Sequence, residues 1–145
     1  MSKLLIQLKV EKVGVGELPL LMKVILSIKP EYAEAILNGD KVFEYRKHIF
    51  KQKVKTVVIY ESSPVCRLVG EFEIDEILVD TPSIIWRKTN KYSGVDKTFF
   101  DMYFSEKPVA YAIKVAKVTR YDEPKLIQSL APSSRPPQSF MYIKE

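Results

Sequence analysis

Short apolar segments separated by turn residues are the feature that most constrains this fold. Apolar or alternating stretches predict strands at residues 24–28, 42–46, 54–60, 65–79 and 109–118. The helical patterns between them are brief and irregularly placed, so they do not supply the regular helical crossovers of a parallel sheet. The sequence therefore predicts an α+β protein. We expect a small mixed or antiparallel sheet curled into a β-barrel, with short helices at its ends.

Helix boundaries are marked by capping residues and prolines. Pro30 suits the first position of a helix that runs through Leu37 and stops at Gly39. Thr81 followed by proline predicts the start of a second helix, and a third is expected from Asp96 to Phe104. Gly70 predicts a bend within the long strand at 65–79.

A length of 145 residues is that of a single domain with room for one hydrophobic core. The second strand-like stretch begins at Met22, so residues 1–21 are interpreted as an N-terminal appendage with one possible strand at 5–11. Residues 22–145 are then the domain itself. Its proline-rich segment at 124–140 predicts an irregular strap or a flexible end.

Composition excludes several classes of protein. No apolar run approaches the roughly 20 residues of a membrane-spanning helix, so no membrane association is expected. Cys66 is the single cysteine and His48 the single histidine, which argues against an internal disulfide and against a metal site. We expect no metal and no cofactor, and a reducing, cytoplasmic setting.

The net positive charge of the chain arises from one window of the sequence. The whole chain has a net charge of +5, and residues 41–55 alone carry +5, from the basic residues Lys41, Arg46, Lys47, Lys51, Lys53 and Lys55 and the single acid Glu44. A local patch of this kind indicates an anionic partner. The alternative is a solvated, lysine-rich strand edge that prevents aggregation.

Glu44 and Arg46 lie two residues apart on a predicted strand, so their side chains project from the same face. A carboxylate beside a guanidinium holds it in one orientation, which suits recognition of phosphate or a base edge. Lys41 lies at the start of the same strand. The alternative is a structural ion pair at the rim of the barrel.

The segment Gly39-x-Lys41-x-x-Glu44-x-Arg46 resembles the signature of the ASCH domain family, which belongs to the PUA-like superfamily of small β-barrels. The flanking residues 27–32 and 136–140 support the resemblance, which covers about residues 22–143. It implies a cleft over the first helix, lined by Lys41, Glu44 and Arg46. It also implies RNA or modified nucleobases as ligands.

One branch of proteins similar to this family hydrolyses the acetyl amide of N4-acetylcytidine. In that branch a threonine nucleophile stands at the position of Glu44, with a lysine at the position of Lys41 and a carboxylate from the later helical region. This chain has no hydroxyl at position 44 and no acid at 90–94. Nucleophilic amide hydrolysis needs an activated hydroxyl or thiol, so the sequence disfavours this activity.

The leading hypothesis is therefore an RNA- or nucleotide-binding regulatory module with a basic cleft and no catalytic activity. Its predicted binding residues are Lys29, Lys41, Glu44, Arg46, Lys47, Ser62, Ser63, Gln138 and Ser139. One alternative is a hydrolase acting on RNA or a modified nucleoside of the N4-acetylcytidine type, with Lys41 and Glu44 as a proton-transfer pair. Another is a protein-interaction module, whose protein partner the sequence does not identify.

Aromatic residues are concentrated in the helical region between the strands. Their spacing predicts core packing first, for Trp86, Tyr92, Phe99, Phe100, Tyr103 and Phe104. One of these rings, or Tyr60, is also a candidate to stack on a base.

Overall fold

The sheet that organises the chain is mixed. A computed structural model describes residues 22–131 and 135–144. Its strands pair in the order β2-β5-β4-β3-β1-β6, and their bounds are β1 (Met22–Ile28), β2 (Phe43–Arg46), β3 (Val54–Glu61), β4 (Arg67–Asp80), β5 (Ala110–Lys125) and β6 (Phe140–Lys144). Strands β1 and β3 run parallel, and every other neighbouring pair in this order is antiparallel. The predicted α+β class and mixed sheet are confirmed.

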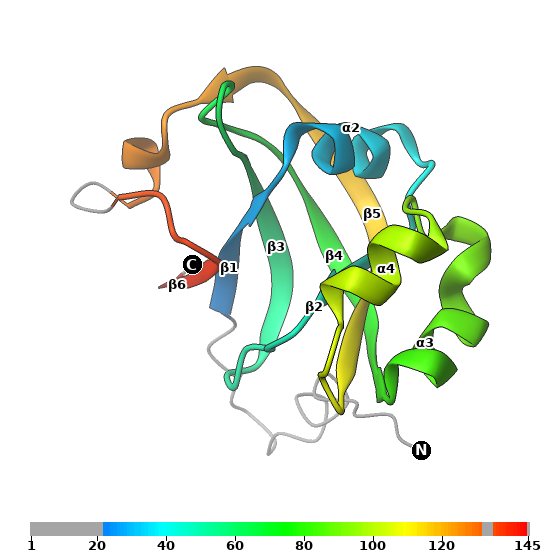
Figure 1. The fold of residues 1–145 in the computed structure, drawn as a ribbon. Coiled ribbons are helices and arrows are strands. Elements are labelled where there is room, and N and C mark those ends of the chain that lie inside the picture. Colours follow the sequence, from blue (N-terminus) through cyan, green and yellow to red (C-terminus); the bar gives the residue numbers. More distant parts are fainter. Residues whose placement is uncertain (1–21, 132–134, 145) are drawn as a thin grey trace.

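Three short helices lie on one side of this sheet (Figure 1). They are α2 (Pro30–Asn38), α3 (Pro82–Thr89) and α4 (Lys97–Tyr103), with 3₁₀ turns η1 (Asn90–Tyr92) and η2 (Ile127–Ser129). Each begins or ends as the sequence predicts. The side chains of Thr81 and Asp96 accept hydrogen bonds from the backbone N–H groups of Ile84 and Phe99, and Gly39 ends α2 in the left-handed conformation.

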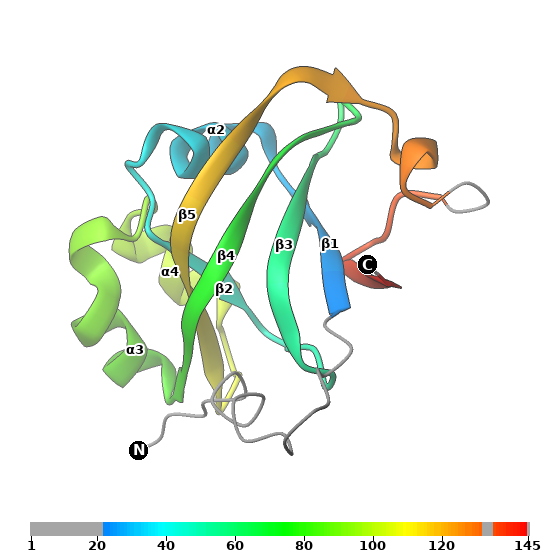
Figure 2. The same cartoon turned by 180° about the vertical axis from the view of Figure 1, so that it is seen from behind.

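The expected closure into a barrel is not seen among the described strands, because β2 and β6 are the two ends of the hydrogen-bonded order. The sheet is strongly curved, and in the reverse view β3, β4 and β5 lie in front of the helices (Figure 2). A side chain nevertheless links β2 to the far part of the sheet. The Arg46 Nη2 of β2 donates to the backbone oxygen of Ser27 in β1 at 2.8 Å.

Apolar side chains gather in three clusters. The first lies inside the curve of the sheet and packs against α2, with Val24, Leu26, Ile36, Ile59 and Phe72 at its centre. The second joins β2 to α3 and α4. The third includes residues of β1, β3 and η2. Burial of these side chains is the main favourable contribution to folding.

Two parts of the chain differ from the sequence prediction. Strand β5 continues to Lys125, so the strap between β5 and β6 spans only 126–139 and is shorter than expected. Beyond the strap, residues 140–144 form β6, which pairs with β1 and which the sequence did not predict. The predicted appendage, residues 1–21, lies outside the described part of the chain. Within residues 22–131 and 135–144, no helix has the length and apolar character needed to cross a membrane.

Gly70 allows strand β5 and helix α2 to approach β4 closely. A methyl group at this position would lie 2.5 Å from the backbone oxygen of Thr119 and 2.8 Å from Cδ2 of Leu37. We expect Gly70→Ala to lower the free energy of unfolding by about 1–3 kcal/mol, because the strand backbone cannot move aside without breaking its ladder. Urea denaturation measures this change. The exposed Asp75→Ala on the same strand is the control, and an equal loss in both variants would contradict the packing argument.

Glu61 at the end of β3 makes the stability of the fold depend on pH. Burial, followed by the neighbouring carboxyl of Glu34, raises the pKa of Glu61 to about 7 from its ordinary 4.5, and Arg120 opposes the shift. The folded state therefore binds a proton that the unfolded state has lost between these pH values, so this group's contribution to stability falls as pH rises from 4.5 to about 7.

We expect Glu61→Gln to flatten the pH dependence of unfolding in that range, as measured by urea denaturation at several pH values. The exposed Glu123→Gln should leave the slope as in the wild type. A slope unchanged by Glu61→Gln would show that other groups cause it.

Candidate functional site

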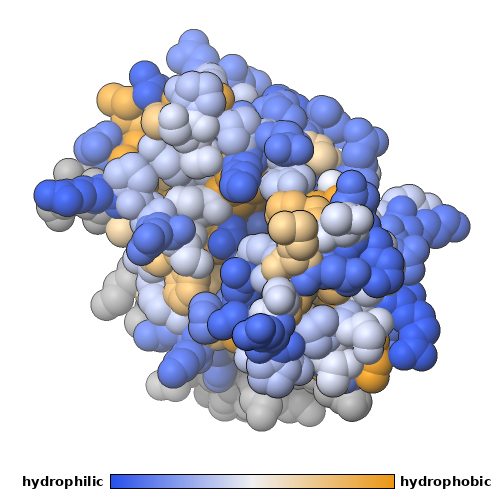
Figure 3. Space-filling view, in the orientation of Figure 1, coloured by the Kyte–Doolittle hydropathy of each residue, from blue (hydrophilic) through white to orange (hydrophobic). Residues whose placement is uncertain are grey.

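A pocket opens between the N-terminal part of α2, strand β2 and helix α4. Its volume is about 240 Å³. The residues that line it come from β1, α2, β2 and α4 and from the segments that precede these helices: Ser27, Ile28, Lys29, Tyr32, Lys41, Glu44, Tyr45, Arg46, Val95, Phe99 and Tyr103. Hydrophobic residues show between hydrophilic ones near the middle of this face (Figure 3). The pocket therefore combines apolar walls with a small number of charged groups, as ligand sites commonly do.

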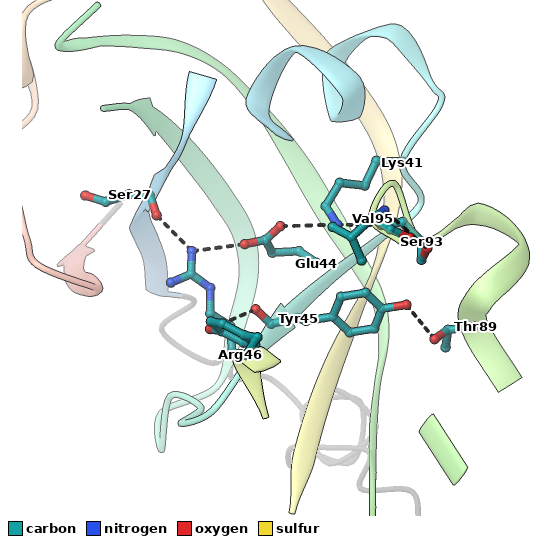
Figure 4. Close-up of polar contacts among 9 residues, drawn as sticks. Ser27, Lys41, Glu44, Tyr45, Arg46, Thr89, Ser93 and Val95 are labelled. Carbon is teal, nitrogen blue, oxygen red and sulfur yellow. Dashed lines mark hydrogen bonds and ion pairs between the residues drawn. The ribbon is translucent and has the colours of Figure 1, made fainter. Parts of the chain in front are cut away.

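The predicted ion pair on β2 is present. The Nη2 atom of Arg46 lies 3.1 Å from Oε2 of Glu44, and the Glu44 side chain is largely buried. The Nη1 atom of Arg46 also donates to Oγ of Ser139 at 3.4 Å. Figure 4 shows the guanidinium reaching from β2 toward Ser27 of β1 with the carboxylate beside it. These contacts fix the plane of the guanidinium.

One N–H donor of this guanidinium makes no hydrogen bond within the described residues. The Nε atom of Arg46 is buried, and it has no hydrogen-bond partner in the described part of the chain. A buried N–H group without a partner costs about 1–3 kcal/mol. Such a group at the wall of an open pocket is a candidate contact for a ligand atom.

Lys41 lies behind the ion pair and is almost fully buried, with 2% of its surface exposed. Its ammonium group donates to the backbone oxygen of Ser93 at 2.6 Å and lies 4.0 Å from Oε1 of Glu44. It is also 5.0 Å from the ring centre of Tyr45. Burial lowers the pKa of Lys41, the charge of Arg46 lowers it further, and Glu44 opposes both. Two cations thus share one carboxylate, and the site keeps a net positive charge.

The loop before α4 is packed directly on Lys41. Gly94 has a φ of +73°, and a methyl group there would lie 2.6 Å from Cγ of Lys41. Only a residue without a Cβ fits both the backbone conformation and the contact. The loop thereby delivers the Ser93 carbonyl to the ammonium group.

An aromatic wall faces the charged groups. The rings of Phe99 and Tyr103 are stacked at 5.9 Å with an interplanar angle of 14°, and Tyr32 lies 5.6 Å from Phe99. The ammonium of Lys47 lies 4.5 Å from the centre of the Tyr103 ring. Burial raises the pKa values of Tyr32 and Tyr103. These phenols stay protonated at neutral pH, so the wall adds no negative charge.

On the opposite face of β2, Tyr45 anchors the strand to α3. The hydroxyl of Thr89 donates to the backbone oxygen of Ile85, and it lies 2.6 Å from the Tyr45 hydroxyl. Since Thr89 has a single proton to give, Tyr45 is the donor in their contact. Burial is the main cause of the raised pKa of Tyr45. The hydrogen bond between Tyr45 and Thr89 thus fixes the strand that carries Glu44 and Arg46 against α3.

A second pocket adjoins the first beneath the strap. Its volume is about 460 Å³, and Ser27 and Lys29 line both pockets. Ser62, Ser63 and Gln138 also line it. We call it the strap pocket. The Ser27 hydroxyl donates to the backbone oxygen of Pro137 at 2.6 Å, and the Ser27 N–H donates to that of Ser139 at 3.0 Å. The strap is therefore docked on the same residue that receives Arg46.

The residues predicted for the site fall into two groups. Lys29, Lys41, Glu44 and Arg46 line the first pocket, whereas Ser62, Ser63 and Gln138 line only the strap pocket. Two others line neither pocket: Lys47 lies over Tyr103, and Ser139 contacts Arg46.

Sequence reasoning missed Ser27 and Tyr32 as parts of the site. Ser27 is far from the motif and acts through its backbone oxygen, which has no signal in the sequence. Tyr32 has the spacing of a core residue on an amphipathic helix. In the described residues, no group of three His, Cys, Asp or Glu side chains could hold a metal ion.

Comparisons with known proteins agree with the fold described above. The family model of the ASCH domain matches residues 26–125, and the chain belongs to this family. The crystal structure of ASCH from Zymomonas mobilis superposes with a TM-score of 0.78 at 21% identity, over 85% of this chain and 88% of that one.

Two relatives in sequence carry descriptive names. The ASCH domain-containing ribonuclease of Zymomonas mobilis is 22% identical over 132 residues, which cover 89% of each chain. The large ribosomal subunit protein uL22 of Ureaplasma parvum serovar 3 is 30% identical over 122 residues. These residues are 83% of this chain but 39% of that protein, so the chain spans about two fifths of the length of this relative.

The Glu44 carboxylate, which lies between two cations, is expected to stabilise the fold. Glu44→Gln keeps the shape of the side chain but leaves Lys41 and Arg46 without their common counter-charge. Because both cations are largely buried, we expect the free energy of unfolding to fall by about 3 kcal/mol.

The matched control for urea denaturation is Asp101→Asn, which breaks an exposed ion pair with Lys97. It should cost less than about 1 kcal/mol. If the two variants lost the same small amount, the pocket's ion pairs would not stabilise the fold.

Proposed function

We propose that the chain is an RNA- or nucleotide-binding module whose first pocket receives a nucleobase. The proposal rests on the Nε of Arg46, which is buried and has no hydrogen-bond partner among the described residues. Its side chain lies beside the Glu44 carboxylate, and both residues line an aromatic pocket. A base edge presents donors and acceptors side by side. A carboxylate oxygen that accepts and a guanidinium N–H that donates match such an edge.

Size and wall chemistry favour a base over a larger ligand. A volume of about 240 Å³ is below the roughly 300–1,000 Å³ of pockets for drug-sized molecules. The Tyr32, Phe99 and Tyr103 rings offer an apolar surface against which one base can pack. A phosphate group alone would leave this aromatic wall without a partner.

Basic side chains near the pocket suit the phosphates of the same strand. Lys29 is exposed at the junction of the two pockets, and Lys47 lies over the Tyr103 ring beside the first pocket. Phosphate contacts by such residues provide affinity without sequence preference. The buried Lys41 acts differently, because its ammonium already has partners. It holds Glu44 and the loop before α4 in place.

A relative supports an RNA context. It is named an ASCH domain-containing ribonuclease, and the match covers 89% of its chain. A regulatory role and a cytoplasmic setting extend this proposal, the latter because Cys66 is the single cysteine in the chain.

Binding is tested with the full chain and a fluorescent panel of single-stranded RNA, at several salt concentrations. We expect affinity to fall steeply with salt, and Arg46→Lys to weaken binding by about 1–3 kcal/mol. Since this change keeps the charge but removes the guanidinium, with Nε and its neighbouring N–H groups, the salt dependence should stay as in the wild type. Matching DNA oligonucleotides show whether the 2′-hydroxyl matters.

Lys55→Arg, an exposed change elsewhere in the basic window, is the control and should bind as the wild type does. RNA binding that Arg46→Lys leaves intact would place the site elsewhere. No salt-dependent binding to any oligonucleotide, together with co-purification of a protein, would favour the protein-interaction alternative.

Cleavage of RNA or hydrolysis of an acylated cytidine is the second candidate function. It is favoured by the relative named a ribonuclease and by the lowered pKa of Lys41, 4.0 Å from Glu44. Lys41 as a base and Glu44 as its partner would move a proton within the pocket. Turnover of RNA or acetylated cytidine by the wild type, lost in Lys41→Met and in Glu44→Gln, would support it. Turnover that survives both changes would refute this mechanism.

A further inference from the structure

The strap pocket lies next to the first pocket. Both are lined by Ser27 and Lys29. Ser27 also binds the strap through two hydrogen bonds, so the boundary between the pockets is held in place. The two pockets are therefore neighbours that meet at Ser27 and Lys29.

The chemistry of the strap pocket differs from that of the first pocket. Lys29 is its one ionisable cation, and no carboxylate lines it among the described residues. The hydroxyls of Ser62 and Ser63 and the amide of Gln138 are neutral hydrogen-bonding groups. Tyr60 and Pro137 supply flat apolar surface. This set suits a second nucleoside, with its sugar hydroxyls and uncharged base.

We propose that the strap pocket binds the adjacent nucleotide of the same RNA strand, and that Lys29 contacts the phosphate that links the two nucleosides. This inference rests on the proposed function of the first pocket. Lys29 is exposed and lines both pockets, which is the location that a linking phosphate requires. The smallest complete ligand is then a dinucleotide.

The strap pocket also sets a chemical preference. Its neutral hydroxyl and amide groups can bind a ribose 2′-hydroxyl as donor or acceptor. The ligand class is therefore a ribodinucleotide within single-stranded RNA, with a deoxyribodinucleotide as the weaker analogue. Double-stranded RNA does not fit, because its bases are paired and stacked.

Isothermal titration of the full chain with ribonucleoside monophosphates and with ribodinucleotides tests the proposal. We expect the best ribodinucleotide to bind at least about tenfold more tightly than either component nucleotide. The exposed pair Ser63→Ala and Gln138→Ala, combined, should bring dinucleotide affinity close to that of the mononucleotide. Mononucleotide affinity should not change in this variant. Lys29→Met should weaken dinucleotide binding and reduce its dependence on salt.

The possible failures are distinguishable. If mononucleotides bind but dinucleotides bind no more tightly, the strap pocket is not a subsite and only this inference is overturned. The same holds if the strap variant weakens both ligands equally. If neither ligand binds and Arg46→Lys behaves as the wild type with RNA, the proposed function itself is refuted.

Discussion

The Arg46 guanidinium is the contact on which the site depends. It leaves β2 at one end of the sheet, pairs with Glu44 of its own strand, and binds the backbone oxygen of Ser27 in β1. The strap docks on Ser27 as well. A single side chain therefore connects β2 to β1 and, through Ser139, to the strap. The same side chain lines the pocket, and its buried Nε has no hydrogen-bond partner among the described residues.

Two cations around one carboxylate require further acceptors. The fold provides them as backbone oxygens, from Ser93 for Lys41 and from Ser27 for Arg46. Removing cations from water is costly unless such partners are fixed in advance. Gly94 allows the loop before α4 to hold the Ser93 carbonyl against the Lys41 ammonium. The net positive charge that remains favours an electron-rich ligand.

Much of the site follows from the local chain. A period of two places Glu44 and Arg46 on one face, and their ion pair is present. Proline and capping residues predicted the three helices. The roles of Ser27 and Tyr32 were missed, because they come from tertiary packing and not from a local pattern. Strand β6 was missed because it is a short segment after a proline-rich strap, and its pairing with β1 is long-range. The expected closure of the barrel failed because β2 and β6 are not paired with each other in the described sheet.

Nuclear magnetic resonance of arginine Nε–H groups observes directly whether the Arg46 Nε–H contacts the ligand. During titration with single-stranded RNA, we expect the Arg46 Nε–H signal, assigned from its loss in Arg46→Lys, to shift and become protected from exchange with water. The signals of Arg87 and Arg120, which line neither pocket, should change little. RNA binding that leaves the Arg46 signal unmoved and unprotected would contradict the account.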